Sequence, residues 1–227
     1  MLRPVADPID DLTSLRAELE ALADPKIAAV NQRHGDDHAV NLTKVRDIAK
    51  RVKTQPELAT QLWASNDSAC RLLALLVCRP QQFSASDLDQ MVRQARTPKV
   101  HDWLVGYVVA KSPHRESLRL AWMDDPDPVV ASAGWALTAQ RVSKSPDGLD
   151  LDALLATIED EMVAAPDRLQ WQMNTTLAHI GIHHPRLRER AISMGERLGV
   201  LKDYPTPPNC TSPYAPLWIN EMVRRQG

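Results

Sequence analysis

Prolines recur along this chain where short apolar patterns begin, and they limit what the chain can fold into. The sequence has 17 prolines but only 8 glycines. Eight of the prolines stand close to such beginnings: Pro25, Pro56, Pro80, Pro98, Pro113, Pro128, Pro166 and Pro185. Proline is tolerated in the first turn of an α-helix but breaks a helix interior. This placement therefore predicts many short helices joined by tight connections.

Apolar residues repeat with helical spacing through most of the chain. Leu12, Leu15, Leu19 and Leu22 form a first stripe of this kind. Helices are predicted over residues 12–22, 40–49, 56–63, 67–78, 86–96, 100–110, 113–123, 128–142, 151–163, 167–180, 187–198 and 215–225. No segment shows a sustained alternation of apolar and polar residues with hairpin turns. The sequence therefore predicts an all-α protein.

Helix pairs of this size suggest a stacked architecture. The stretch DPDPVVASAGWAL, Asp125–Leu137, resembles the second half of a HEAT repeat, and its small residues Ala131, Ala133 and Gly134 would let neighbouring helices approach closely. We expect an α-solenoid (superhelix) of HEAT-like antiparallel helix pairs. Residues 1–200 would form the repeat domain. Residues 201–227 would add a proline-rich connection and a C-terminal capping helix to the same domain.

The composition is that of an ordinary soluble globular protein. The chain has 227 residues, of which 44% are hydrophobic and 25% charged. No run approaches 18 consecutive apolar residues, so no transmembrane helix or membrane partner is predicted. The first residues lack an apolar signal core, which favours a cytoplasmic protein. Three cysteines, Cys70, Cys78 and Cys210, fit a reducing compartment better than a disulfide framework.

The charges are balanced in sum but unevenly distributed. The net charge of −2 is unlike that of a dedicated nucleic-acid binder and argues against strong nonspecific binding. Basic residues nevertheless collect in Lys44–Lys53, Arg93–Arg119 and Arg186–Arg197. Acidic residues collect in Asp7–Asp24 and Asp147–Glu161. A surface polarised into basic and acidic regions is compatible with this pattern.

The stretch KVHDWLVGYVVAKSP, Lys99–Pro113, has the most suggestive chemistry. It places Asp102 between His101 and Trp103 at the start of an apolar helix, in a region where cations outnumber acids. One interpretation is a carboxylate that acts on a polyanion. The other is an acidic residue near a helix N-terminus, where the helix dipole favours it.

Several segments together resemble the HEAT-like-repeat alkylpurine DNA glycosylases, the AlkD-like DNA alkylation repair family. The matching segments are RHGDDHAVNLTKVRDIAKRV, PELATQLWASNDSACRLLALLV, VHDWLVGYVVAKSP, VVASAGWALTA and MNTTLAHIGIHHPRLRERAI. In the second, Leu62, Trp63 and Arg71 stand where such proteins have a Leu-Trp pair and a helix-borne Arg. The resemblance covers roughly residues 25–200, and it rests on the order and spacing of these segments.

The resemblance implies a concave basic groove that holds double-stranded DNA, from which alkylated purines are excised. An Asp, helped by aromatic faces and an Arg, would stabilise the cationic sugar as the glycosidic bond breaks. An alignment through the Ala-Lys-Ser-Pro end places Asp102 at the catalytic position, whereas one anchored on Trp103 places Tyr107 there. In the first alignment the family's Trp, Arg and second Trp correspond to Pro98, Ser132 and Thr175.

Six residues are candidates for DNA contact: Arg71, Lys99, His101, Trp103, Lys111 and Arg115. Cations among them would contact phosphates without reading sequence. Arg71 has an alternative role within the repeat. Its methylene groups would lie along apolar surface with the guanidinium in solvent, or its charge would pair with an acidic residue. Trp135 is expected in the core, and Trp171 in a groove or in a gap between helices.

No metal or other cofactor is predicted. His179, His183, His184 and Cys210 carry suitable ligand atoms, but only one thiol is offered, and Gly181 is expected to break the helix between the first two histidines. Two functions remain open. The leading one is a DNA-repair-related protein that binds duplex DNA and excises alkylated purines through Asp102. The alternative is a non-catalytic HEAT-repeat module for protein or DNA interaction, since fold alone does not decide function.

Overall fold

The computed structural model describes residues 11–226. The chain divides into two compact units, with the boundary between His114 and Arg115. We describe each unit by itself. Within the described residues the regular structure is helical, apart from an isolated antiparallel bridge between Ala23 and Val40. The prediction of an all-α protein is confirmed.

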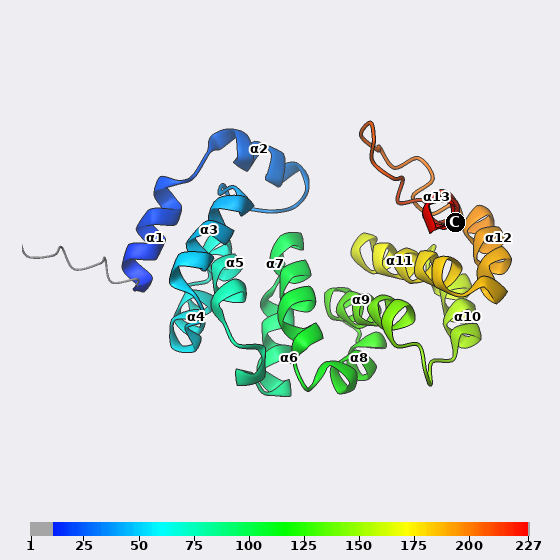
Figure 1. Ribbon diagram of the computed structural model, residues 1–227, viewed down its shortest axis with the longest axis horizontal. Helices are drawn as coiled ribbons and strands as arrows, with labels where there is room; N and C mark the ends of the chain where they lie inside the picture. The colour runs from blue at the N-terminus through cyan, green and yellow to red at the C-terminus, as the bar shows by residue number, and fades with distance from the viewer. Residues whose placement is uncertain (1–10, 227) are drawn as a thin grey trace, which may run out of the picture. The chain divides into compact units, whose positions relative to one another are not determined.

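The first unit contains seven α-helices and three short helical turns among its described residues (Figure 1). These are α1 (Leu12–Ala21), α2 (Pro25–Arg33), α3 (Leu42–Val52), α4 (Pro56–Ala64), α5 (Ser68–Val77), η1 (Pro80–Gln82), α6 (Ala85–Gln94), α7 (Pro98–Trp103), η2 (Leu104–Val108) and η3 (Val109–Lys111). Helix α5 is the centre of this unit, because it packs against α1, α3, α4 and α7.

The second unit contains the remaining helices of the described chain. These are α8 (Arg115–Met123), α9 (Pro128–Lys144), α10 (Leu151–Glu161), α11 (Asp167–His183), η4 (Pro185–Leu187), α12 (Arg188–Leu198) and α13 (Ala215–Gln226). Helix α9 packs against both α8 and α11, and α13 packs on α11 and α12. Residues 200–214 before α13 contain no helix, as the proline-rich sequence predicts.

Prolines begin four of the α-helices, as expected: Pro25 in α2, Pro56 in α4, Pro98 in α7 and Pro128 in α9. Asp24 and Asp127 precede two of them and accept backbone N–H groups of the first turn. Helix α2 was absent from the predicted ranges. It contains no buried residue, so it shows no apolar stripe that a periodicity search could find.

Each unit has its own apolar core. In the first, Leu72 and Leu73 of α5 are fully buried. In the second, Trp135 of α9 and Met173 and Leu177 of α11 are buried together. Burying a side chain of this size contributes about 1.5–3 kcal/mol before the entropy cost of folding is counted. The expectation that Trp135 is a core residue is confirmed.

Two glycines allow helices of the second unit to approach closely. A Cβ added to Gly134 of α9 would lie 2.7 Å from the backbone nitrogen of Met123 in α8. A Cβ added to Gly181 of α11 would overlap the side chain of Ile219 in α13. The prediction that Gly181 breaks its helix is wrong, because α11 continues through it to His183. This glycine allows close packing and does not end a helix.

None of the helices in residues 11–226 has the length and apolar character that crossing a bilayer requires.

Candidate nucleic-acid interface

The stretch Lys99–Pro113 changes helical geometry twice within its length. Helix α7 ends at Trp103, η2 is a π-helical turn, and η3 is a 3₁₀ turn. The wider π geometry is seen where the Val109 amide donates to the Leu104 carbonyl, five residues earlier. Such turns are rare and often lie at functional sites. At the other end, the buried carboxylate of Asp36 accepts the Lys99 amide at 2.7 Å and holds the start of α7.

Basic and aromatic side chains stack on one another around η2. The Arg46 guanidinium from α3 lies over the Trp103 ring, 4.5 Å from its centroid, and donates to the Tyr107 hydroxyl at 3.4 Å. The rings of Trp103 and Tyr107 have centroids 5.3 Å apart. The Lys111 ammonium lies 5.7 Å from the centroid of the Tyr107 ring. We call these four residues the basic–aromatic cluster.

A basic depression adjoins the cluster through Arg46. It has a volume of about 380 Å³, and three of its lining residues are the cations Arg46, Lys50 and Lys53. Lys53 ends α3 with φ 61° and ψ −161°, a backbone conformation that is adopted almost only by glycine and that tends to occur at functional sites. The nearby Asp47 lies 3.6 Å from Lys50 in an exposed pair, which is weak in water. We call this depression the basic notch.

Asp102 is exposed on α7, with 52% of its side chain accessible. The neighbouring His101 is buried, and its Nδ1 lies 3.7 Å from the Asp102 carboxylate. Trp103 is also largely buried, so its contribution to a surface is the ring face that it presents to Arg46. The carboxylate therefore has access to solvent, whereas the histidine beside it has almost none.

The other predicted contact residues are spread over both units. Arg71 of α5 stacks on Trp63 at 4.7 Å and donates to the Gln94 carbonyl at 3.1 Å, which ties α5 to α4 and to the end of α6. Lys99 is half-buried, and Lys111 is exposed in η3. Arg115 is exposed at the first position of α8, in the second unit.

The three positions that the first alignment predicts to match the glycosylases' Trp, Arg and second Trp carry side chains with local roles. Pro98 opens α7. Ser132 is fully buried and donates to the Val129 carbonyl at 2.7 Å. Thr175 donates to the Trp171 carbonyl at 2.9 Å. A proline ring and two hydroxyls that bond to their own helices supply neither an aromatic face nor a cation.

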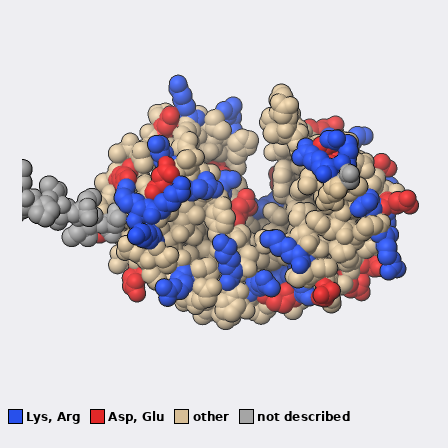
Figure 2. All heavy atoms as spheres, viewed as in Figure 1, with Lys and Arg blue, Asp and Glu red and all other residues tan. Residues whose placement is uncertain are grey.

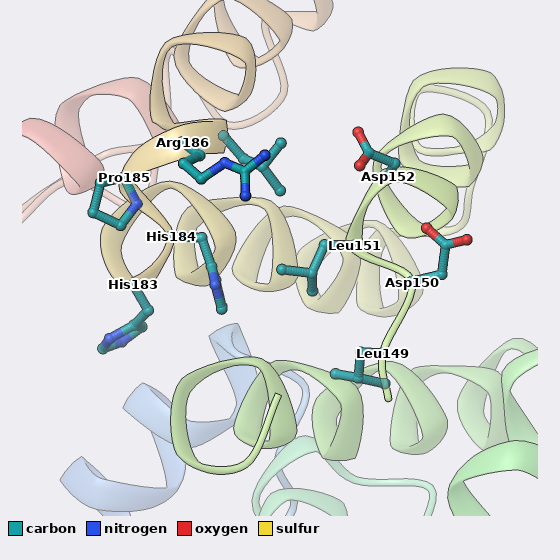
Figure 3. A pocket seen from close by; sticks show the side chains of 9 residues that line it. Leu149, Asp150, Leu151, Asp152, His183, His184, Pro185 and Arg186 are labelled. Carbon is teal, nitrogen blue, oxygen red and sulfur yellow. The ribbon is translucent and has the colours of Figure 1, made fainter. Parts of the chain in front are cut away.

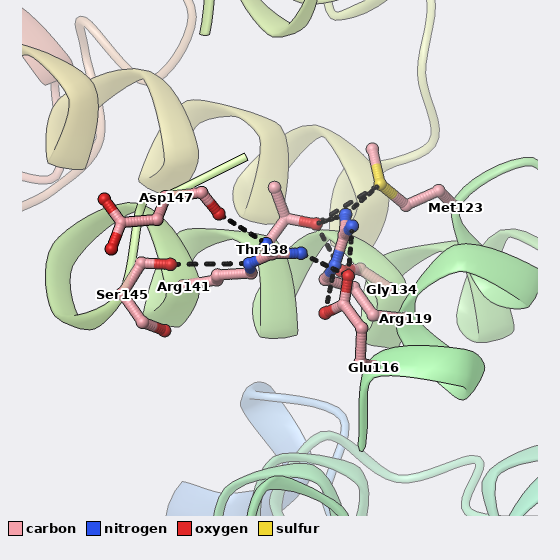
Figure 4. A network of polar contacts seen from close by, with 8 residues as sticks. All are labelled: Glu116, Arg119, Met123, Gly134, Thr138, Arg141, Ser145 and Asp147. Atoms are coloured by element: carbon pink, nitrogen blue, oxygen red, sulfur yellow. Dashed lines mark hydrogen bonds and ion pairs between the residues drawn. The ribbon is translucent and has the colours of Figure 1, made fainter. Parts of the chain in front are cut away.

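Several arginines of the second unit pair with carboxylates. Glu116 of α8 pairs with Arg119 at 2.8 Å and also with Arg141 of α9 (Figure 4). Arg119 is buried and donates to the Thr138 hydroxyl at 3.2 Å. The bond from Arg119 holds the pKa of the Glu116 carboxyl below its usual value. This network fastens α8 to α9, and its two guanidinium charges are partly neutralised.

A larger pocket of the second unit has mixed charge. It measures about 750 Å³ and brings Asp150 and Asp152 together with His183, His184 and Arg186 (Figure 3). His184 Nε2 lies 3.0 Å from the Val142 carbonyl. With two carboxylates in its wall, the pocket is a poor receptor for a polyanion. Within residues 11–226, no three His, Cys, Asp or Glu side chains gather as a metal site would require.

Charges of both signs occur on each unit, as the face shown in Figure 2 illustrates. No uniformly basic surface is visible on that face. Arg46, Lys50 and Lys53 were not predicted as individual contacts, although they lie in the basic segment Lys44–Lys53. The missing signal was spatial: α3 meets η2 across 61 positions of sequence between Arg46 and Tyr107.

Comparison with known proteins agrees with this fold and with its resemblance to a family. The family model of the DNA alkylation repair enzymes matches residues 15–219. The chain belongs to this family.

The relatives are distant. The uncharacterized protein Lin0241 of Listeria innocua is 23% identical over 93% of this chain and 96% of its own length. The uncharacterized protein Lmo0209 of Listeria monocytogenes is 22% identical over 82% of this chain and 85% of its own length. A solved structure described as belonging to "a new family of proteins related to the HEAT-like repeat DNA glycosylases with affinity for branched DNA structures" matches with a TM-score of 0.79. It shares 22% identity and covers 95% of both chains. The predicted HEAT-like fold is thereby confirmed.

Proposed function

We propose that this member of the DNA alkylation repair family binds DNA through the basic–aromatic cluster and the basic notch, with branched DNA as its preferred form. The observation that carries the proposal is the position of Arg46, which belongs to both features. Its guanidinium lies on the Trp103 ring while the same side chain lines the notch beside Lys50 and Lys53.

The chemistry of the two features suits adjacent parts of a nucleotide chain. Three cations around a depression can hold phosphate oxygens, and each phosphate contact adds affinity that falls as salt rises. A guanidinium stacked on an aromatic face keeps its full charge, because the ring does not neutralise it. Tyr107 and Trp103 fix the direction of Arg46, so less side-chain entropy is lost when a phosphate binds.

The preference for branched DNA comes from the solved relative, whose description gives it affinity for branched structures. It also suits the modest number of cations in the notch. A small basic surface gains little from a long straight duplex, whereas several strands converge at a branch and bring their phosphates close together. We therefore expect selectivity among DNA shapes rather than high affinity for any duplex.

The direct test is fluorescence anisotropy with a labelled four-way junction and a linear duplex of the same composition. We expect wild type to bind the junction more tightly than the duplex, with an affinity that decreases as salt rises. The double variant Lys50→Ala/Lys53→Ala should reduce the slope of log affinity against log salt by about 0.9 for each phosphate that the protein no longer neutralises. The matched control is Lys26→Ala/Arg33→Ala, which removes two exposed cations from α2. Equal decreases in both double variants would argue against the notch.

Excision of alkylated purines through Asp102 is a second candidate function. The observation in its favour is that the Asp102 carboxylate is exposed to solvent one residue from Trp103. The positions carried by Pro98, Ser132 and Thr175 offer it no aromatic or cationic partner of the family type. The test is release of N3- or N7-alkylated purine from duplex DNA by wild type and Asp102→Asn. Release that depends on Asp102 would establish catalysis; no release at high enzyme concentration would leave binding as the function.

A further inference from the structure

A second pocket lies far along the sequence from the basic–aromatic cluster, in the C-terminal part of the second unit. It has a volume of about 310 Å³ and is built from α11, the connection before α13, and α13 itself. Trp171, Tyr204 and Trp218 form its aromatic walls, and Pro205 and Pro213 are among the prolines that complete it. We call it the aromatic pocket.

The walls of this pocket are fixed by contacts within the unit. The Tyr204 ring meets the Trp171 ring edge to face, with centroids 5.2 Å apart. The Trp218 ring lies 5.9 Å from the ring of His179 in the same geometry. Asn174, which is buried in α11, donates to the Pro213 carbonyl at 2.8 Å and so holds the connection against the helix. Prolines further restrict the backbone of the connection, and the pocket therefore exists before a ligand binds.

The distribution of charge limits what this pocket can take. None of its lining residues is Asp, Glu, Lys or Arg. At its edge, Arg225 lies 3.5 Å from the hydroxyl of Thr211, a lining residue. Glu221 pairs with both Arg225 and Arg224, and these bonds lower the pKa of the Glu221 carboxyl to about 2. One carboxylate against two guanidinium groups leaves this group of α13 side chains with a net positive charge, next to a neutral, aromatic interior.

We propose that the aromatic pocket binds an unpaired nucleobase of single-stranded DNA, with the adjoining phosphate near Arg225. Every base has an aromatic face that can stack on tryptophan or tyrosine, and such stacking tolerates any sequence. The neutral walls suit an uncharged planar ring, and the positive edge suits the anionic backbone that carries it. A proline-rich peptide, the other ligand that aromatic surfaces commonly bind, carries no anion for that edge.

This inference rests on the proposed function only in taking DNA as the ligand. It assigns the recognition of unpaired bases to the second unit, whereas the basic notch of the first unit contacts the backbone of paired DNA. The two sites can therefore fail separately in experiment.

The test uses a duplex with a single-stranded overhang that contains 2-aminopurine, a base whose fluorescence decreases when it stacks. Wild type should quench it, and Tyr204→Ala should weaken binding of the overhang by a factor between about 5 and about 150, the range for removal of one base–aromatic stack. Tyr204 is 41% exposed, so its replacement spares the core. The control is Leu217→Ala, which removes a 54% exposed side chain next to Trp218 but outside the pocket.

A second measurement needs no variant. Cys210 lines the pocket and is exposed, while burial raises the pKa of the Cys70 and Cys78 thiols to about 11. A thiol reagent should therefore modify Cys210 first. We expect a thymidine oligonucleotide to slow this modification severalfold, and a blunt duplex or a polyproline peptide to leave its rate unchanged.

The outcomes separate the two proposals. Quenching that is abolished in Tyr204→Ala but kept in Leu217→Ala and in Lys50→Ala/Lys53→Ala supports the aromatic pocket. Quenching that survives Tyr204→Ala, protection of Cys210 by polyproline alone, or no protection by the oligonucleotide overturns it. A wild type that quenches the base but shows no salt-dependent binding of junction or duplex would instead count against the basic notch.

Discussion

The two units use their basic side chains in different ways. In the part of the chain that the structure describes, the three cation–π contacts all lie in the first unit: Arg46 on Trp103, Arg71 on Trp63 and Lys111 on Tyr107. In the second unit, Arg119, Arg141, Arg190, Arg197, Arg224 and Arg225 pair with carboxylates. Among its described residues the first unit also has ion pairs, and of the cations in the cluster and the notch only Lys50 takes part in one, the weak contact with Asp47.

The difference matters for binding because an aromatic ring and a carboxylate affect a cation differently. A carboxylate offsets the charge of a guanidinium and fixes its position. An aromatic face orients a guanidinium but leaves its charge available to a ligand. The network around the buried Arg119 therefore mainly stabilises the fold, whereas Arg46 of the cluster can also bind a polyanion. Arg225 shares the Glu221 carboxylate with Arg224, so the three groups together keep a positive charge.

The largest expected effect comes from breaking the carboxylate network of the second unit. Glu116→Ala should lower the free energy of unfolding by about 3 kcal/mol, because it leaves the buried Arg119 without its acidic partner. Urea unfolding measures the change. Glu161→Ala, which removes an exposed carboxylate at the end of α10, should change stability by less than about 0.5 kcal/mol. DNA affinity of folded Glu116→Ala should not fall; a large decrease in affinity would mean that the second unit's network also serves binding.

The next effect compares two glycines. Gly134→Ala should destabilise the protein by about 1–3 kcal/mol, because the new Cβ would meet the α8 backbone 2.7 Å away. Gly106→Ala in η2 has no atom within 4 Å of the new Cβ and should be neutral or stabilising by up to about 1 kcal/mol. Thermal unfolding of both variants measures the contrast. Equal destabilisation would show that η2 requires glycine for its backbone geometry.

A smaller effect is expected in the first unit. Arg46→Ala should weaken binding of a DNA junction about fivefold, since it removes one phosphate contact and the stack on Trp103. Arg46→Lys keeps the charge but not the planar group, so we expect an intermediate affinity with an almost unchanged salt slope. Neither variant should lower the free energy of unfolding by more than about 1 kcal/mol. If Arg46→Ala instead unfolds the protein, its guanidinium has the same structural role as those of the second unit.

The smallest effect is a pH dependence of stability. His38 is buried in the first unit with Nδ1 3.1 Å from the Val40 carbonyl, and burial lowers its pKa below 6.5. The folded state thus resists protonation that the unfolded state accepts. Stability should be complete above pH 6.5 and decrease as the pH falls toward the lower pKa of the folded protein. The melting temperature of His38→Gln should depend less on pH over this window than that of wild type. Identical pH profiles would assign the effect to other groups, such as His179, whose pKa is also lowered by burial.

Most of the fold could be predicted from the sequence because the patterns that indicate helices are local. Proline at helix starts and apolar residues at helical spacing identified most helices without any partner. Helix α2 was not predicted because none of its residues is buried, so it has no apolar stripe. Gly181 was misinterpreted because a side chain at this position would overlap Ile219 of α13. Ile219 lies far along the sequence, and local sequence rules do not report such a contact.

The site was accessible only in part for the same reason. The stretch Lys99–Pro113 was identified from its composition, and it does supply Trp103, Tyr107 and Lys111 to the cluster. Arg46 was not predicted individually because the sequence does not distinguish it from the other cations of its helix. It differs from them in its contact with the Trp103 ring, which comes from another part of the chain. The roles of Asp102 and of the six predicted contact residues stay predictions.

The π-helical turn has a consequence for tracing the ancestry of this stretch. A π turn accommodates one residue more than an α-helix would over the same rise, and it is what a single insertion into a helix would leave behind. Residues after Leu104–Val108 are therefore shifted by one position relative to those of a continuous α-helix. Alignments with relatives that have a regular helix here will differ in register according to the side of the turn on which they are anchored. A regular α-helix over Leu104–Val108 would point Tyr107 in a different direction from the one in which it accepts the Arg46 guanidinium.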